Sequence, residues 1–247
     1  MKRSRKFILG FALLSVAGAA TVTLANLWKS KLVVEHVAVS GTSIIEASEI
    51  TKLARVPSGI KMVDVDLLAI EQRIATHPYV DEVVVERNLP STIHIRIAER
   101  RPLAILNGRD LRYIDREGVV LPNSISKELF DLPVVTGLSG SSAPTPGTVL
   151  TDADLADALD ILETSKLVGG GLYHLISEIR LRGSGDLLLY TADGGVPVIF
   201  GRGNVPRKLV ALETFWQTVV AGRGAQQLQY LDLRFDDQII ARWKQKS

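Results

Sequence analysis

The chain has 247 residues, of which 46% are hydrophobic and 23% are charged. These fractions are close to the averages of globular proteins, and they argue against a largely disordered chain and against a protein with many membrane spans. The chain has no cysteine, which excludes disulfides, thiolate metal ligands and cysteine nucleophiles, and its formal net charge of +2 gives no broad basic surface for nucleic acid.

The first predicted element is an uncharged stretch at residues 7–28, FILGFALLSVAGAATVTLANLW. As a helix, this stretch is long enough to cross a hydrocarbon core of about 30 Å. Basic residues are more numerous before it than after it: Lys2, Arg3, Arg5 and Lys6 precede it, and Lys29 and Lys31 follow it. This bias predicts a cytoplasmic tail at residues 1–6, a transmembrane helix at residues 7–28 in contact with the lipid bilayer, and an exported remainder.

Residues 7–28 are open to two other interpretations. A cleaved signal peptide has the same basic start and apolar core, and Ala17-Gly18-Ala19 imitates its cleavage site, but the apolar run continues past that point through Leu24. A buried core helix is disfavoured because the stretch has no polar face. The membrane anchor and the cleaved signal peptide both place the rest of the chain outside the cytoplasm.

Residues 32–101 have the pattern of a small α+β domain. The expected elements are a strand at 33–39, a helix with Ile45, Ile50 and Leu53 on one face, a helix capped by Asp66 that carries Leu67, Ile70 and Ile74, and strands at 80–87 and 92–97. Ile93, Ile95 and Ile97 alternate along the last strand, which predicts that both helices cover one face of the sheet.

This part of the chain resembles a POTRA domain. The resemblance is carried by Val39-Ser40-Gly41 at the end of the first strand and by HPYVDEVVVERNLPSTIHIRIAERRPLA at residues 77–104. Within that stretch, the helix-ending His77-Pro78-Tyr79-Val80, the turn Arg87-Asn88-Leu89-Pro90 and the closing Glu99-Arg100-Arg101-Pro102 form a recognisable set.

Residues 102–247 are predicted to form a mainly β domain with two helices. The expected strands are at 111–115, 119–121, 133–136, 176–181, 187–190, 198–200, 229–235 and 239–243, and the expected helices run from Thr151 to Gly169-Gly170-Gly171 and from 205 to 219. Asp115-Arg116-Glu117-Gly118 is a hairpin turn, and residues 137–147, which are rich in Ser, Gly and Pro, form a loop.

This second part resembles the β domain of the FtsQ/DivIB family. The matching residues are Tyr113-Ile114-Asp115 with Gly118-Val119-Val120-Leu121, then Gly201-Arg202-Gly203 ahead of a basic helix, and Tyr230-Leu231-Asp232-Leu233-Arg234-Phe235. Anchor, POTRA domain and β domain in this order cover nearly the whole chain. The resemblance implies a non-enzymatic scaffold of the division septum in the bacterial inner membrane, with its bulk in the periplasm and with no cofactor or small-molecule substrate.

The residues themselves show little sign of catalysis or metal binding. The histidines His36, His77, His94 and His174 lack a metal-ligand spacing, and Ser184 lies outside a nucleophile-elbow motif. Gly201-Arg202-Gly203 lacks the remaining residues of a phosphate loop, and Asp236-Asp237 lacks the glycine and glutamate of an EF-hand. We expect ordinary turns and surface side chains at these positions.

A binding surface is predicted at the C-terminus, because no later strand follows residues 239–243 to cover the sheet edge. The resemblance implies that FtsB, held with FtsL, binds there by strand addition, and that the POTRA domain engages other septal proteins such as FtsK. The positions that match this interface are Arg234, Phe235 and Trp243, with Tyr230 and Arg202 as further candidates. The alternative for Phe235 and Trp243 is a place in the core.

The sequence leaves two alternative functions open. A POTRA component of protein translocation would need a long C-terminal run of alternating membrane strands, for which the chain is too short. A membrane-tethered periplasmic hydrolase would need a nucleophile or paired carboxylates brought together by folding, and a structure with such a site would favour it.

Overall fold

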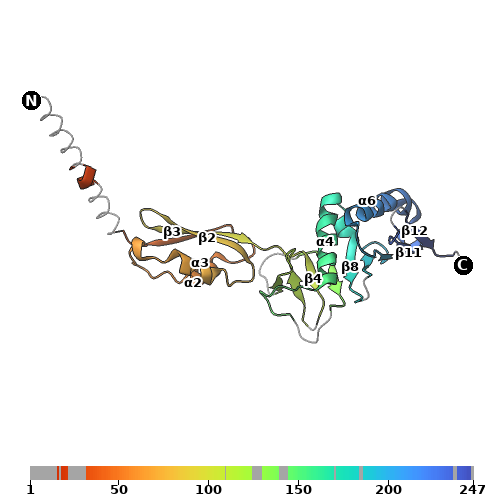
Figure 1. The fold of residues 1–247 in the computed structure, drawn as a ribbon, viewed down its shortest axis with the longest axis horizontal. Coiled ribbons are helices and arrows are strands. Elements are labelled where there is room, and N and C mark those ends of the chain that lie inside the picture. Colours follow the sequence, from red (N-terminus) through yellow and green to blue (C-terminus); the bar gives the residue numbers. More distant parts are fainter. Residues whose placement is uncertain are drawn as a thin grey trace, which may run out of the picture. The chain divides into compact units, whose positions relative to one another are not determined.

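The structure is a computed structural model that describes residues 16, 18–21, 32–108, 110–123, 130–138, 144–169, 171–183, 186–235 and 238–245. The chain divides into two compact units, Met1–Glu99 and Arg100–Ser247 (Figure 1). Among the described residues, no helix is both long and apolar enough to cross a bilayer. Most of the span predicted at residues 7–28 lies outside the described residues; Val16 and residues 18–21 are helical.

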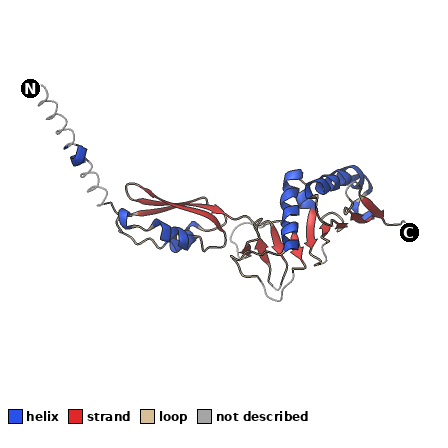
Figure 2. Cartoon of the chain, viewed as in Figure 1, coloured by secondary structure: helices blue, strands red, loops and turns tan. Residues whose placement is uncertain are grey.

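The first unit contains a three-stranded sheet covered by two helices. Its elements are β1 (His36–Ser40), α2 (Ala47–Ala54), the 3-10 turn η1 (Met62–Asp64), α3 (Leu67–Ile74), β2 (Val80–Asn88) and β3 (Thr92–Glu99). In the strand order β1-β3-β2, β1 is parallel to β3 and β2 is antiparallel to β3. Both helices lie on one face of the sheet (Figure 2), which confirms the predicted β-α-α-β-β arrangement.

Local signals in the sequence account for most of these elements. Ile93, Ile95 and Ile97 are buried on the face that the helices cover, and the Asp66 side chain accepts a hydrogen bond from the Ala69 amide at 3.0 Å, which caps α3. The first strand begins later than predicted. Residues 33 and 34 pair instead with the segment before η1, as in the hydrogen bond from the Val34 amide to the carbonyl of residue 60 at 2.9 Å, and the Glu35 amide donates to the Ser91 carbonyl at 2.9 Å.

Glu99, the last residue of β3, fixes the loop between β1 and α2 through its side chain. Its carboxylate accepts hydrogen bonds from the amides of Ser43, Ile44 and Ile45 at 2.8–3.1 Å, and from the Ser43 hydroxyl at 2.8 Å. Partial burial raises the pKa of Glu99, but these donors outweigh that effect and hold the pKa below its ordinary value of 4.5.

The second unit contains a nine-stranded sheet in the order β12-β11-β10-β9-β8-β7-β4-β5-β6. The strands are β4 (Ala104–Leu106), β5 (Arg112–Ile114), β6 (Val120–Pro122), β7 (Val134–Thr136), β8 (Ile176–Arg180), β9 (Leu188–Thr191), β10 (Pro197–Ile199), β11 (Leu228–Asp232) and β12 (Ile240–Trp243). The parallel pairs β4-β7, β7-β8 and β10-β11 interrupt an otherwise antiparallel sheet.

Two long helices, α4 (Ala153–Val168) and α6 (Val205–Phe215), pack together over this sheet. Their buried faces join the strands in one apolar core that includes Leu159, Phe200, Leu209 and Leu212. The helix predicted at 205–219 continues beyond its predicted end: α6 is followed by the π segment η2 (Trp216–Val220) and the short α7 (Ala221–Arg223). The short helix α5 (Leu172–Leu175) and the 3-10 turn η3 (Ala225–Gln227) complete the unit.

Candidate partner-binding edge

The candidate site is built on β12, which lies at one margin of the nine-stranded sheet. Its neighbour is β11, and no strand in the described part of the chain pairs with its other side. The opposite margin, β6, is covered: the Val120 amide donates to the Thr148 carbonyl at 2.9 Å, and the Gly147 amide donates to the Val120 carbonyl at 2.7 Å. An uncovered edge strand is a template for a further strand.

One hydrogen bond fixes the direction of the amides along β12. The Lys244 amide donates to the Gln227 carbonyl at 2.8 Å. Because successive amides of an antiparallel strand point to opposite sides, the Arg242 amide also faces β11, whereas the amides of Ala241 and Trp243 face outward. These two outward amides are the donors that an added strand would meet first.

Arg234 follows the end of β11 and folds back on Asp232. Its backbone amide and Nε each donate to Oδ1 of Asp232 at 3.0 Å, and its Nη2 donates to Oδ2 at 2.7 Å. Hydrogen bonding by this guanidinium, partly opposed by burial, lowers the pKa of Asp232 below its ordinary 3.8. The sequence predicted a strand up to Phe235, and this prediction was wrong: the side-chain bond from Asp232 to the amide two residues later turns the chain out of the strand.

The loop that carries Arg202 lies beside Arg234, because it follows β10, which runs parallel to β11. The Leu233 amide donates to the Ile199 carbonyl at 2.8 Å and extends this pairing by one step. Gly201 has a φ of 67°, and a Cβ placed on it would come within 2.8 Å of Cγ of Arg234. The side chain of Arg234 therefore rests on the backbone of Gly201.

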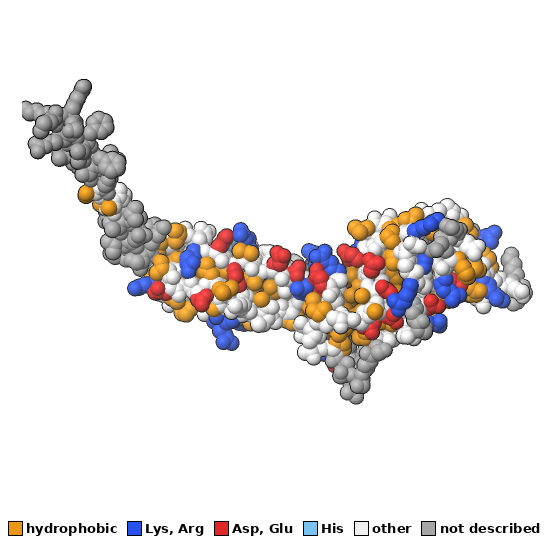
Figure 3. Space-filling view, in the orientation of Figure 1, with side chains coloured by type: hydrophobic (Ala, Val, Ile, Leu, Met, Phe, Trp, Pro, Cys, Tyr) orange, Lys and Arg blue, Asp and Glu red, His pale blue; other side chains and the backbone are white. Residues whose placement is uncertain are grey.

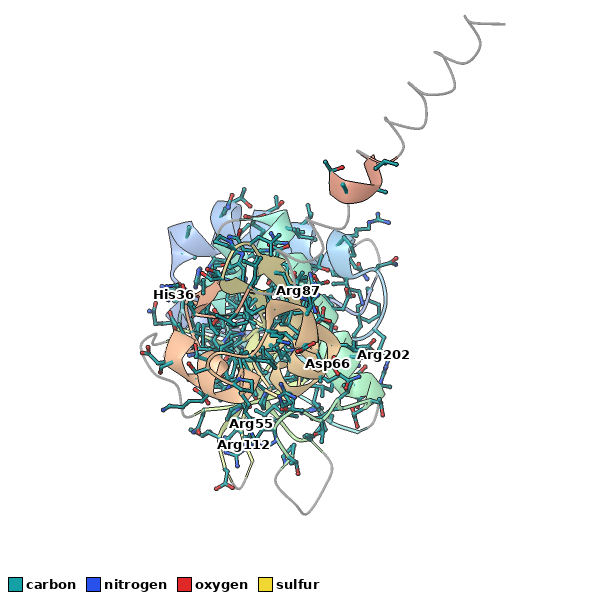
Figure 4. The ribbon with its side chains drawn as sticks, turned by 90° about the vertical axis from the view of Figure 1, so that its left-hand side faces the viewer. His36, Arg55, Asp66, Arg87, Arg112 and Arg202 are labelled. Carbon is teal, nitrogen blue, oxygen red and sulfur yellow. The ribbon has the colours of Figure 1, made fainter. Side chains whose placement is uncertain are left out.

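Arg202, which is labelled in Figure 4, is paired with two aspartates of helix α4. Its Nη1 donates to Oδ2 of Asp157 at 2.5 Å, and its Nη2 pairs with Oδ1 of Asp154. Asp154 and Asp157 are three residues apart and face the same side of the helix. The Arg202 side chain is 44% exposed, so it lies at the surface with its charge already paired.

Lys208 fixes the backbone of the loop that carries Arg202 by hydrogen bonds from its side chain. It is a buried lysine near the start of α6, and its Nζ donates to the carbonyls of Phe200 at 3.0 Å and Arg202 at 2.8 Å. Two carbonyl acceptors compensate for part of the cost of burying the ammonium group. The backbone that presents Arg202 is thereby fixed to the helix.

Phe235 is the most exposed aromatic group of the site, with 46% of its surface accessible. It lines a pocket of about 250 Å³ between α6 and the segment that follows β11. The other lining residues are Arg207, Lys208, Ala211, Leu233, Gln238 and Ile239. An exposed aromatic ring at the mouth of a partly apolar pocket is the kind of anchor point on which partner binding depends.

Trp243 and Tyr230 are half-buried. Trp243 packs against the domain core while the guanidinium of Arg223 lies 4.9 Å from its ring centre. Tyr230 belongs to β11, an internal strand, and pairs in register with Arg242. Trp243 therefore combines core packing with a surface position, whereas Phe235 is on the surface.

The structure brings four of the five predicted site residues onto the β11–β12 hairpin and its connection, namely Tyr230, Arg234, Phe235 and Trp243, and places Arg202 on the adjoining loop. Sequence reasoning missed Asp232, Gly201 and Lys208 as the groups that position them. Basic and acidic side chains are intermixed on the face of this unit seen in Figure 3.

One polar arrangement in the first unit has the order of a hydrolytic triad. The Ser40 hydroxyl lies 3.0 Å from Nε2 of His94, and Nδ1 of His94 lies 3.4 Å from Oε1 of Glu86. Glu86 also forms an ion pair with Arg96 at 3.1 Å. These residues belong to three neighbouring strands of the sheet. Among the described residues, no group of His, Cys, Asp and Glu side chains could hold a metal ion.

Two family models match the chain. Residues 32–100 match the POTRA domain of FtsQ type, and residues 104–234 match the C-terminal domain of the cell division protein FtsQ/DivIB. The second match alone covers more than half of the chain. Both agree with the resemblances predicted from the sequence.

Three curated relatives that align along most of their length are described as cell division protein FtsQ. The protein of Salinibacter ruber is 32% identical over 239 residues, which are 93% of this chain and 90% of the relative. The protein of Geotalea daltonii is 30% identical over 244 residues, 98% and 88% of the two chains, and that of a Geobacter species is 33% identical over 210 residues, 84% and 75%. The chain therefore belongs to the FtsQ/DivIB family of cell division proteins, which are not enzymes.

Proposed function

We propose that the chain is a scaffold of the bacterial division septum that links early and late division proteins. The observation that carries this proposal is the uncovered edge strand β12, flanked by Arg234 and the exposed Phe235. A family of non-enzymatic cell division proteins needs such protein-binding surfaces rather than a catalytic pocket.

The scaffold is anchored in the inner membrane by residues 7–28, with residues 1–6 in the cytoplasm and the domains at 32–101 and 102–247 in the periplasm. The uncharged length of the anchor and the excess of basic residues before it support this topology. The descriptions of the relatives as cell division proteins are consistent with a septal location.

The partner at β12 is the periplasmic part of FtsB, held with FtsL, and it binds by adding a strand. Main-chain hydrogen bonds to the outward amides of Ala241 and Trp243 supply affinity, and side chains supply specificity. Phe235 contributes buried apolar area, and Arg234 pairs with an acidic residue of the partner. Arg202 and Tyr230 lie next to this contact. The POTRA domain serves other septal proteins, with FtsK as the candidate.

Binding of the full chain, held in nanodiscs, to a peptide of the FtsB periplasmic segment tests this proposal. Phe235→Ala and Arg234→Glu are each expected to weaken saturable binding severalfold. Val149→Ala is the matched control, because Val149 is 57% exposed but lies beside the opposite margin of the sheet. Wild-type protein that does not bind at high micromolar peptide, or variants that bind as tightly as wild type, would rule out this site.

Among the described residues, the contacts of His94 with Ser40 and Glu86 favour a hydrolase as the alternative function. The geometry argues against it, because Ser40 lies in a regular strand rather than on a strained turn, and the Glu86 side chain is 44% exposed and its carboxylate is shared with Arg96. The pocket beside Phe235 is not lined by these residues. A fluorophosphonate probe is expected to leave Ser40 unlabelled, and labelling that Ser40→Ala abolishes would instead establish an activated serine.

A further inference from the structure

The topology of the first unit places several segments at one end of it. Strands β1 and β3 are parallel and begin at this end, and the antiparallel β2 finishes there. We call it the near end; it comprises residues 32–35, 59–68 and the β2–β3 turn at 88–91. The far end, where β3 finishes, lies about 25 Å away along the eight-residue strand. Figure 4 faces the near end and labels His36, Asp66 and Arg87.

Hydrogen bonds join the segments of the near end to one another. The Arg87 side chain donates from Nε to the Met62 carbonyl at 2.7 Å and from Nη2 to the Val65 carbonyl at 2.6 Å, which holds η1 against the end of β2. The Met62 amide donates to the Leu32 carbonyl at 2.8 Å and holds η1 to the start of the unit. Side chains carried by η1 therefore have a fixed direction.

Exposed aliphatic side chains gather at this end. Five large hydrophobic residues between 32 and 99 are exposed, and four of them belong to the near end: Val33 at 36%, Val63 at 52%, Leu68 at 62% and Leu89 at 48%. They come from the three segments of the near end, which are distant from one another in sequence. Clustered exposure of this kind marks a contact surface, whereas single exposed aliphatic residues do not.

We propose that the near end lies against the outer surface of the bilayer, with these aliphatic side chains in its headgroup region. This inference rests on the proposed anchor at residues 7–28. Residues 29–32 connect that anchor to the unit and span at most about 14 Å when fully extended. So short a tether keeps the near end at a high effective concentration beside the lipid, and a small apolar patch is then sufficient for contact.

The charges at the near end indicate which lipids it recognises. Glu35, Asp64 and Asp66 are exposed there together with Lys61 and Arg87, so the patch has no excess of positive charge and attraction to anionic headgroups does not drive the contact. The contact is apolar insertion at the boundary between headgroups and acyl chains. It therefore forms on zwitterionic phosphatidylcholine as well as on mixtures with phosphatidylglycerol.

The absence of cysteine allows the test to use single labels in the full chain. Asn88→Cys at the near end and Glu82→Cys toward the far end lie on the same face of β2, about 20 Å apart. Each carries an environment-sensitive fluorophore in nanodiscs with lipids that bear a quencher at the headgroup boundary. A third label, at Ala19→Cys near the centre of the proposed span, is measured in discs whose lipids carry the quencher on their acyl chains, and it reports whether the anchor is in the bilayer.

We expect quenching to be severalfold stronger at position 88 than at position 82 in both lipid compositions. Adding Val63→Asp and Leu68→Asp should reduce quenching at position 88 to the level of position 82. Val84→Asp adds a charge at an exposed aliphatic position in the middle of β2 and should leave it unchanged.

Equal quenching at positions 88 and 82, with position 19 quenched, would overturn the inference and leave the anchor intact. Quenching at position 88 only in phosphatidylglycerol-containing discs would overturn apolar insertion as its cause. A label at position 19 that is not quenched would overturn the anchor and the inference together.

Discussion

The side chain of Arg234 lies across the backbone of Gly201, so closely that a Cβ on Gly201 would approach Cγ of Arg234 to 2.8 Å. The two residues follow the parallel strands β11 and β10, and their contact joins the C-terminal hairpin to the loop that carries Arg202. The direction of the Arg234 guanidinium therefore depends on the absence of a side chain at position 201.

Gly201→Ala is expected to displace Arg234 and to weaken partner binding severalfold. Gly203→Ala is the control, because Gly203 has a similar φ of 70° and open space around it. Each substitution costs about 1 kcal/mol through the positive φ, so calorimetry should find similar backbone costs, while isothermal titration should find weaker binding for Gly201→Ala alone. Equal binding by both variants would show that the Gly201 contact does not direct Arg234 to the partner.

Ala241→Pro is expected to abolish strand addition and leave the fold intact. Proline removes an amide that faces away from β11, and edge strands tolerate it at such positions. Arg242→Pro removes an amide that faces β11 and should instead detach β12 from the sheet. Hydrogen exchange of the β11 amides distinguishes the two variants, and peptide binding by folded Ala241→Pro at wild-type affinity would exclude β12 as the acceptor edge.

Replacing Asp154 and Asp157 together by Asn should strengthen partner binding if Arg202 belongs to the interface. The substitutions release Arg202 from α4 while changing the stability by less than about 1 kcal/mol, because the ion pairs are partly exposed. Titration with the FtsB peptide at low and high salt measures the effect. Unchanged affinity of the double variant would remove Arg202 from the interface.

Glu99→Gln is expected to destabilise the first unit by about 1–2 kcal/mol at pH 7, since an amide satisfies the three backbone donors less well than a partly exposed carboxylate. The pKa of Glu99 is lowered in the folded state, so the unfolded chain binds the proton more readily. Its contribution is complete above pH 4.5 and is lost as the pH falls through the lower folded pKa.

Denaturant unfolding at a series of pH values measures this difference. The gap between wild type and Glu99→Gln should shrink below pH 4.5, in step with protonation of Glu99. A gap that stays constant down to the acid transition would assign the effect of the substitution to packing rather than to charge.

The first unit was predictable because its signals are local. Alternation of Ile93, Ile95 and Ile97 identified a half-buried strand, and Asp66 before an apolar helical repeat identified a capped helix. In the second unit, β4 was missed because Ala104–Leu106 is only three residues long and its strand neighbours, β5 and β7, are supplied by the rest of the chain.

The candidate site was only partly predictable. The motif around Arg234 and Phe235 located the C-terminal hairpin, but the turn made by Asp232 depends on a side-chain hydrogen bond that a strand-like pattern conceals. The pairing of Arg202 with α4 joins residues 45 and 48 positions apart in sequence. Burial of Lys208 was also unexpected, because a lysine near a helix start is usually solvated.

The uncovered margin of β12 also affects the protein before it meets a partner. An edge strand that accepts a partner's strand can also accept a strand of another copy of the chain, since main-chain hydrogen bonding is indifferent to sequence. On the proposed function, chains made in excess of the partner are therefore exposed to self-association and to proteolytic removal. Cellular abundance should then follow the supply of the partner, so that the two proteins accumulate in matched amounts.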